Sequence, residues 1–132
     1  MPACGRSARL LAALILAMFA LQVHAAPDAA ARGEIEYLLG HLETSGCKFF
    51  RNGDWHDASR ARRHIERKYD WLVRRDLVAS AEQFIERAAT ESSRSGEAYL
   101  VRCGQADPVA SAVWMTDALA RFRSSAAPAR EE

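Results

Sequence analysis

Apolar residues recur every three or four positions in several segments of the chain, a spacing typical of helices with one buried face. The first such segment predicts a helix from about Gly33 to Thr44, and Gly46 supplies the stop that follows it. Residues 26–32 are rich in alanine and are expected to fray. The buried stripe of this helix is predicted to consist of Ile35, Leu38, Leu39 and Leu42.

Three further helices carry start signals. Asp57 is a good N-cap for a helix over 58–75, with Ala61, Ile65 and Leu72 on its inner side. Ser80 and Gln83 have the spacing of a capping box, which opens a third helix. Asp107-Pro108 places a cap before a proline and predicts a fourth helix that continues to about Phe122.

The first 25 residues have the three-part order of a cleavable signal peptide. Arg6 and Arg9 precede an apolar run over 10–23, and Val23-His24-Ala25 is a small-x-small pattern. Because the run is shorter than the roughly 20 residues that span a bilayer, an uncleaved anchor is the weaker alternative. We expect cleavage after Ala25, no stable membrane span afterwards, and a periplasmic or secreted protein.

Cleavage would leave 107 residues, enough for one domain over 26–123 and a disordered polar tail over 124–132. The mature chain would carry 16 basic and 17 acidic side chains, a net charge of −1. Nothing in this balance indicates a nucleic-acid partner.

Two cysteines, Cys47 and Cys103, would remain after cleavage. In an oxidising compartment such a pair predicts a disulfide. The alternative of a redox-active pair lacks the Cys-x-x-Cys spacing.

Each cysteine lies in a short segment that resembles a strand, 47–50 before the Asn52-Gly53 turn and 98–103 near the other end. If Cys47 lies opposite Cys103 in an antiparallel pair, Phe49 faces Val101, Phe50 faces Leu100 and Lys48 faces Arg102. The predicted fold is therefore mainly α, a small α+β domain of about four helices packed around a short two-stranded antiparallel β element.

The known catalytic and nucleotide-binding motifs are missing from the sequence: there is no His-Glu-x-x-His, Gly-x-Ser-x-Gly, phosphate-binding glycine loop or dinucleotide fingerprint. Histidines His41, His56 and His64 have no spacing typical of metal ligands. We therefore predict no metal and no cofactor, and favour binding over catalysis.

The polar residues of most interest lie in two places. His64 and Lys68 are one helical turn apart at the edge of an apolar stripe, where they could bind an anion or supply a proton. Alternatively, His64 makes one hydrogen bond at the core edge while Lys68 extends into solvent. Arg51 and Asn52 follow the first strand, where Arg51 could hold a carboxylate or phosphate, or pack on Tyr99.

A basic stripe also runs along the second predicted helix. Such a stripe could meet an anionic polymer, although a solvated helix face is the commoner explanation. Its members are Arg60, Arg63, Arg67 and Arg74.

Four motifs in order resemble the YfeK-like family of small exported bacterial proteins, a domain of unknown function. They are Phe50-Arg51-Asn52-Gly53, Ala61-x-x-His64-Ile65-x-x-Lys68, Ser80-Ala81-Glu82-Gln83-Phe84-Ile85 and Ser95-Gly96-x-x-Tyr99-Leu100-Val101. The resemblance covers about 35–101 and implies a bacterial, periplasmic address without an activity. It singles out Arg51, Asn52, His64 and Lys68 as polar residues in otherwise structural motifs.

The leading hypothesis is a non-enzymatic periplasmic module that uses these four residues to recognise an anionic group on an envelope polymer or protein. The main alternative is a small envelope hydrolase in which His64 works as acid or base with Glu66 or Asp54. A third possibility is a structural partner domain with an exposed apolar patch around Trp55, Trp71 or Trp114.

Overall fold

The computed structural model of the protein describes residues 26–127. The predicted signal peptide over 1–25, with Cys4 and His24, lies outside the described residues, as do residues 128–132 of the predicted tail. The described part contains four helices, α2 (Ala29–Thr44), α3 (Ala58–Val73), α4 (Ala81–Ala88) and α5 (Ser111–Ala126). None of these helices is long and apolar enough to cross a membrane.

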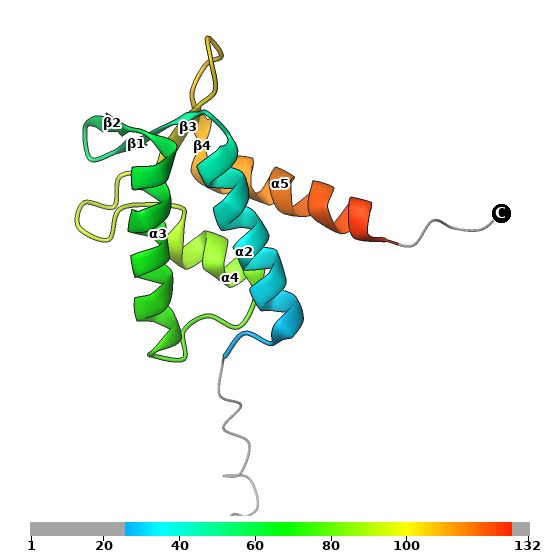
Figure 1. The fold of residues 1–132 in the computed structure, drawn as a ribbon. Helices are drawn as coiled ribbons and strands as arrows, with labels where there is room; N and C mark the ends of the chain where they lie inside the picture. Colours follow the sequence, from blue (N-terminus) through cyan, green and yellow to red (C-terminus); the bar gives the residue numbers. More distant parts are fainter. Residues whose placement is uncertain (1–25, 128–132) are drawn as a thin grey trace, which may run out of the picture.

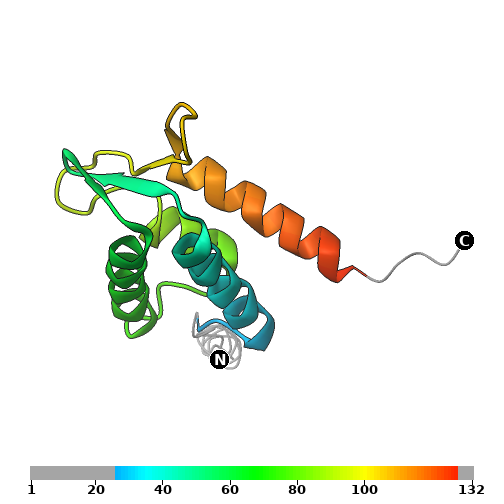
Figure 2. The same cartoon turned by 45° about the horizontal axis from the view of Figure 1, so that its top comes forward.

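A small antiparallel sheet lies across one end of the helices. Figure 1 shows α2 and α3 side by side below the sheet. Helix α5 starts at the sheet edge (Figure 2) and packs against α2, where Phe122 stacks on Tyr37 and Arg123 pairs with Glu34. The strands, in the order β2-β1-β3-β4, are β1 (Lys48–Arg51), β2 (Asp54–His56), β3 (Leu100–Arg102) and β4 (Val109–Ala110).

The mainly helical α+β fold is confirmed, but the sheet is larger than predicted. The structure adds β2 and β4 outside the predicted pair, so the protein is not all-α and the two-stranded element is corrected to a four-stranded sheet. Both added strands are only two or three residues long, too short for an alternating pattern to reveal them.

The predicted pairing of the central strands is confirmed. Phe49 lies opposite Val101, and Phe50 opposite Leu100. Cys47 and Cys103, just outside the paired residues, form a disulfide. The like charges of Lys48 and Arg102 do face each other, but the Arg102 guanidinium lies 4.2 Å from the ring centre of Trp55, a cation–π contact that gives this charge its own partner.

The Asn52-Gly53 turn does more than end a strand, because it folds β1 back onto β2. Both residues have positive φ, 48° and 89°, as a two-residue type I′ hairpin turn requires. Arg51 is paired with Asp54 across the turn. The hairpin therefore fixes the direction of Arg51, at the last position of β1.

The fourth helix begins later than predicted, which is a correction with consequences for the site. Asp107-Pro108 does not cap a helix, because Val109 and Ala110 instead pair with β3. Ser111 starts α5, and its backbone N–H donates to the Tyr99 carbonyl at 2.9 Å. The pairing of two extra residues with the sheet thus shifts the helix start to Ser111.

The other helix boundaries follow their caps. Asp28 accepts a hydrogen bond from the Ala31 N–H at 2.8 Å and starts α2 at Ala29, inside the segment expected to fray. Asp57 caps α3 as predicted. Ser80 caps α4, and the Gln83 side chain reaches back to the Ala79 N–H at 2.8 Å, one residue before the usual capping-box partner.

The core lies where the four helices meet the inner face of the sheet. The predicted apolar stripes point into it, and Phe84 of α4 and Met115 of α5 are completely buried. Phe49 brings β1 into the same cluster, and Trp114 packs against its edge. This arrangement anchors β1 and α3 on either side of the pocket described next.

Candidate functional site

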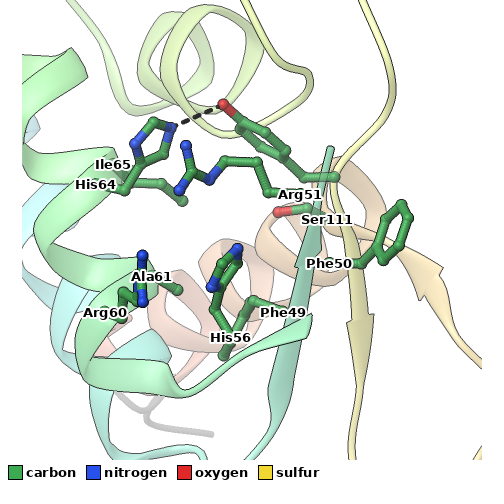
Figure 3. A pocket seen from close by; sticks show the side chains of 10 residues that line it. Phe49, Phe50, Arg51, His56, Arg60, Ala61, His64, Ile65 and Ser111 are labelled. Atoms are coloured by element: carbon green, nitrogen blue, oxygen red, sulfur yellow. Dashed lines mark hydrogen bonds between the residues drawn. The ribbon is translucent and has the colours of Figure 1, made fainter. Parts of the chain in front are cut away.

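A narrow pocket lies between α3 and the strands (Figure 3). Its apolar walls are formed by Phe49, Phe50, Ala61 and Ile65. The polar groups around it are Arg51, His56, Arg60, His64, Tyr99 and Ser111. None of the described residues that line the pocket is a carboxylate, so its titratable side chains, apart from Tyr99, are arginines and histidines.

Arg51 is the charged group that reaches furthest across this space. Its guanidinium lies beside His64 in Figure 3, after the side chain has crossed from β1 toward α3. Within residues 26–127 its side chain makes no hydrogen bond or ion pair, whereas Arg62 and Arg123 each hold carboxylates. A half-buried guanidinium with free donors is suited to an external anion.

His64, Tyr99 and Lys68 form a chain of polar contacts at one wall of the pocket. The Tyr99 hydroxyl lies 3.0 Å from Nε2 of His64, and Lys68 Nζ donates to that hydroxyl at 3.3 Å and to the Glu91 carbonyl at 2.8 Å. Because an ammonium only donates, the arrangement that uses every group has Tyr99 accepting from Lys68 and donating to His64. His64 is then neutral and carries its proton on Nδ1.

The titration properties of these groups agree with a neutral His64. Burial, followed by the positive charges of Arg51, Lys68, Arg67 and His56, lowers the pKa of His64 from 6.5 to about 4. Burial also lowers the pKa of Lys68, partly opposed by Glu91, and raises the pKa of Tyr99. The electrostatic potential at His64 is therefore positive, and the ring is partly shielded from water. Both conditions favour a bound anion.

The depressed pKa of His64 predicts a loss of stability in acid. Between about pH 6.5 and 4, His64 binds a proton in the unfolded chain but not in the folded chain. The free energy of unfolding therefore falls as the pH drops through this window, and it is unaffected above it. The full difference would be worth about 3 kcal/mol, and solvent screening of the partly exposed ring reduces it to about 1–2 kcal/mol.

Urea denaturation at pH 7 and pH 4 measures this loss. His64→Gln should shrink the difference between the two pH values by about 1–2 kcal/mol, because the amide does not titrate. His56→Gln, on another wall of the same pocket, is the matched control and should keep most of the loss. An unchanged difference in His64→Gln would show that the ring is not held neutral by the fold.

The structure brings some of the predicted site residues together and separates others. Arg51 and His64 line the same pocket. Lys68 is connected to it through Tyr99 and lines a neighbouring hollow with His64 and Trp71. Asn52 is exposed and does not line the pocket, and its Oδ1 accepts a hydrogen bond from the Ser95 hydroxyl at 2.6 Å.

Four polar residues of the pocket were not predicted as site members. His56 was considered only as a metal ligand and Arg60 only as part of the basic stripe, and the other two are Tyr99 and Ser111. Tyr99 was considered only as a surface for Arg51, although its place in the resemblance offered a signal. Ser111 offered none, since the helix start predicted at Pro108 placed it within the helix. The structure exposes only 1% of Ser111, and its Oγ has no hydrogen-bond partner among the described residues.

The basic stripe of α3 does not act as one surface. Arg60 lines the pocket, and Arg67 lines the neighbouring hollow. Arg63 donates to the Ser59 hydroxyl at 3.4 Å, and the Arg74 side chain makes no hydrogen bond or ion pair among residues 26–127. The stripe therefore contributes to the site only where it meets the sheet and the loop before β3.

The features named by the alternative hypotheses lie elsewhere. Glu66 is 3.6 Å from Arg62, and Asp54 is exposed across the hairpin. Neither acid lines the pocket beside His64, so the hydrolase hypothesis stays a prediction. Trp71 is 46% exposed, but the Arg75 guanidinium lies 3.9 Å from its ring centre. Among residues 26–127, no group of three potential ligands is placed to hold a metal ion.

Comparison with known proteins places the chain in a family. Residues 29–123 match the model of a family of unknown function, DUF5329, which covers α2 to most of α5. The chain belongs to the DUF5329 family. No curated protein and no solved structure matches it. The match includes every residue of the pocket, so the geometry described here belongs to the DUF5329 domain itself.

Proposed function

We propose that this DUF5329 domain is an exported, non-enzymatic binding module that recognises an anionic group on an envelope polymer or protein. The recognition centre is the pocket between α3 and β1, with Arg51 as the principal ligand-binding residue and His64 beside it. The observation that carries the proposal is that Arg51 is half-buried and that its guanidinium has no hydrogen bond or ion pair among the described residues.

The charges around the pocket support an anionic ligand. Arg60 and His56 lie at the same pocket as Arg51, and the cationic neighbours disfavour a proton on His64. Cations gathered without a carboxylate repel one another, and an anion between them relieves this repulsion. The apolar walls raise the strength of such an interaction because they exclude part of the water.

The proposal also assigns roles to the other two residues predicted from the sequence. Lys68 positions Tyr99, and Tyr99 in turn orients His64. Asn52 shapes the hairpin turn and ties it to Ser95, which holds the end of β1 and therefore Arg51 in place. These are positioning residues, and the anion itself contacts Arg51.

Export is the remaining part of the proposal. It rests on the three-part pattern of residues 1–25, on the cysteine pair and on the resemblance to YfeK-like exported proteins. Mass spectrometry of the expressed protein should find a chain that begins at Ala26. A chain that retains Met1 and stays in the cytoplasm would contradict export to the envelope, but it would not contradict anion binding in the pocket.

Anion binding is tested by nuclear magnetic resonance of the isotope-labelled protein. Sodium acetate and inorganic phosphate are the probes, with sodium chloride at equal ionic strength as the reference. Amide shifts should move around Arg51 and His64, and the bound anion should raise the pKa of His64, because a negative charge nearby favours the imidazolium.

Arg51→Gln should weaken this binding by about ten-fold or more, since a charge-assisted bidentate contact is worth about 1.5–3 kcal/mol. Arg74→Gln, which removes the same charge from the far end of α3, is the matched control and should bind like the wild type. Equal binding by Arg51→Gln and the wild type, or no shift with either probe, would refute the proposed function.

A further inference from the structure

One polar group in the pocket has no use within the fold. The Ser111 hydroxyl belongs to a side chain that is 1% exposed, and its Oγ has no hydrogen-bond partner among residues 26–127. Figure 3 shows this hydroxyl pointing toward the space that Arg51, His64 and His56 surround. Because a buried hydroxyl without a partner is costly, its position indicates a ligand atom on the other side.

The helix start at Ser111 is a second feature that favours an anion beside the Ser111 hydroxyl. Ser111 is the first residue of the 16-residue helix α5, and its N-cap, Ala110, has no side chain that can cap the helix. The first turn of α5 therefore lacks the side-chain oxygen that Asp28, Asp57 and Ser80 supply to the other helices, although its Ser111 N–H donates to the Tyr99 carbonyl. An anionic oxygen beside Ser111 would take the place of that missing cap.

The shape of the pocket restricts the class of anion. Donors are found on two sides, at the Arg51 guanidinium and at Ser111, and between them the walls are the hydrocarbon surfaces of Phe49, Ala61 and Ile65. A planar carboxylate has two oxygens for these donors and can turn a short hydrocarbon group toward those walls. A phosphate would leave additional charged oxygens against apolar side chains, at a desolvation cost.

We infer that the pocket binds a carboxylate that carries a short aliphatic group. The carboxylate oxygens accept hydrogen bonds from the Arg51 guanidinium, and one of them also accepts from the Ser111 hydroxyl. This inference rests on the proposed function and specifies its ligand. The carboxylate is either that of a free short-chain acid or the end of a peptide with a small last residue. Both have the same chemistry at the pocket, and the probes below distinguish them.

The test compares dissociation constants for acetate, isobutyrate, N-acetylalanine and inorganic phosphate with the wild-type domain. Isobutyrate should bind several-fold tighter than acetate, because its two methyl groups are buried against the apolar walls, and both should bind tighter than phosphate. N-acetylalanine represents the peptide end. If it binds at least as tightly as isobutyrate, the carboxylate is that of a chain end, and if it binds more weakly, that of a free acid.

Ser111→Ala is the decisive variant because its two expected effects have opposite signs. Carboxylate affinity should fall by about five- to ten-fold with the loss of one hydrogen bond, while the melting temperature of the free protein should rise, because an unsatisfied buried hydroxyl is removed. Ser92→Ala is the matched control. Ser92 is the other buried serine among the described residues, and its hydroxyl already accepts from the Arg94 N–H. Its loss should lower the melting temperature without changing affinity.

The outcomes separate the inference from the proposed function. Phosphate bound as tightly as isobutyrate, together with unchanged affinity in Ser111→Ala, would overturn the carboxylate inference while anion binding at Arg51 stands. A lower melting temperature in Ser111→Ala would also overturn it, because the hydroxyl would then have a partner within the fold. No binding of any probe would overturn the proposed function first.

Discussion

Replacing both Cys47 and Cys103 with serine should lower the free energy of unfolding by about 4 kcal/mol. The two residues are 56 positions apart, and their disulfide closes a loop that contains β1, β2, α3, α4 and β3. Without it, the unfolded chain regains the entropy of that loop. For a domain of this size the loss is a large part of the total stability, which is about 5–15 kcal/mol for native proteins.

Urea denaturation of the double variant, beside wild-type protein with and without a reductant, measures this effect. The reduced wild type should unfold at nearly the same urea concentration as the double variant, since both lack the same constraint. A loss below about 1 kcal/mol would contradict the prediction and would show that the strand pairing of Phe49 with Val101 already holds the two ends of the loop together.

Phe84→Ala should have an effect of similar size, a loss of about 3–5 kcal/mol. Phe84 is completely buried at the centre of α4, and the ring of Tyr69 meets it edge-on at 5.4 Å between centroids. The variant removes a large apolar group from the place where α3, α4 and the rest of the core meet, and the helices around it can close the cavity only in part.

Thermal unfolding followed by circular dichroism measures this loss. Val113→Ala provides the control, because Val113 is a hydrophobic residue of α5 that is 56% exposed and should tolerate the same kind of truncation within about 0.5 kcal/mol. If Phe84→Ala cost no more than the control, the centre of the core would have to lie away from α4.

Much of the fold was predictable because it depends on local signals. The apolar stripes of α2 and α3 and the caps at Asp57 and Ser80 are properties of a few neighbouring residues, and the structure confirms them. The register of β1 with β3 was predictable for a different reason. A disulfide brings two distant positions together and leaves little freedom for the residues beside them.

The errors concern strands and helix ends whose residues depend on distant partners. Asp107-Pro108 is a strong helix-start signal on local grounds, but Val109 and Ala110 gain more from hydrogen bonds to β3 than from an earlier helical turn. Likewise Asp54–His56 becomes a strand because the I′ turn returns it to β1. In both cases the local preference of the segment was overridden by hydrogen bonds to another strand of the sheet.

The features of the candidate site also divide into those that the sequence indicated and those that required the tertiary structure. The sequence pointed to Arg51 and His64 as polar residues in structural motifs, and their residue types already indicated an anion. The sequence could not show that the Arg51 side chain has no hydrogen bond or ion pair among residues 26–127, that Tyr99 joins His64 to Lys68, or that Asn52 binds Ser95 and does not line the pocket. These facts depend on where β1, α3 and the segment before β3 meet in space.

By itself, the sequence determined the helical stripes, their caps, the central strand pair and the cationic character of the candidate site. Each follows from neighbouring residues or from the disulfide between Cys47 and Cys103. Only the tertiary structure decided that β4 delays α5 until Ser111, and thereby leaves a buried hydroxyl and an uncapped helix end beside Arg51. The physical reason is that a hydrogen bond, or the lack of one, at a buried atom depends on every element around it.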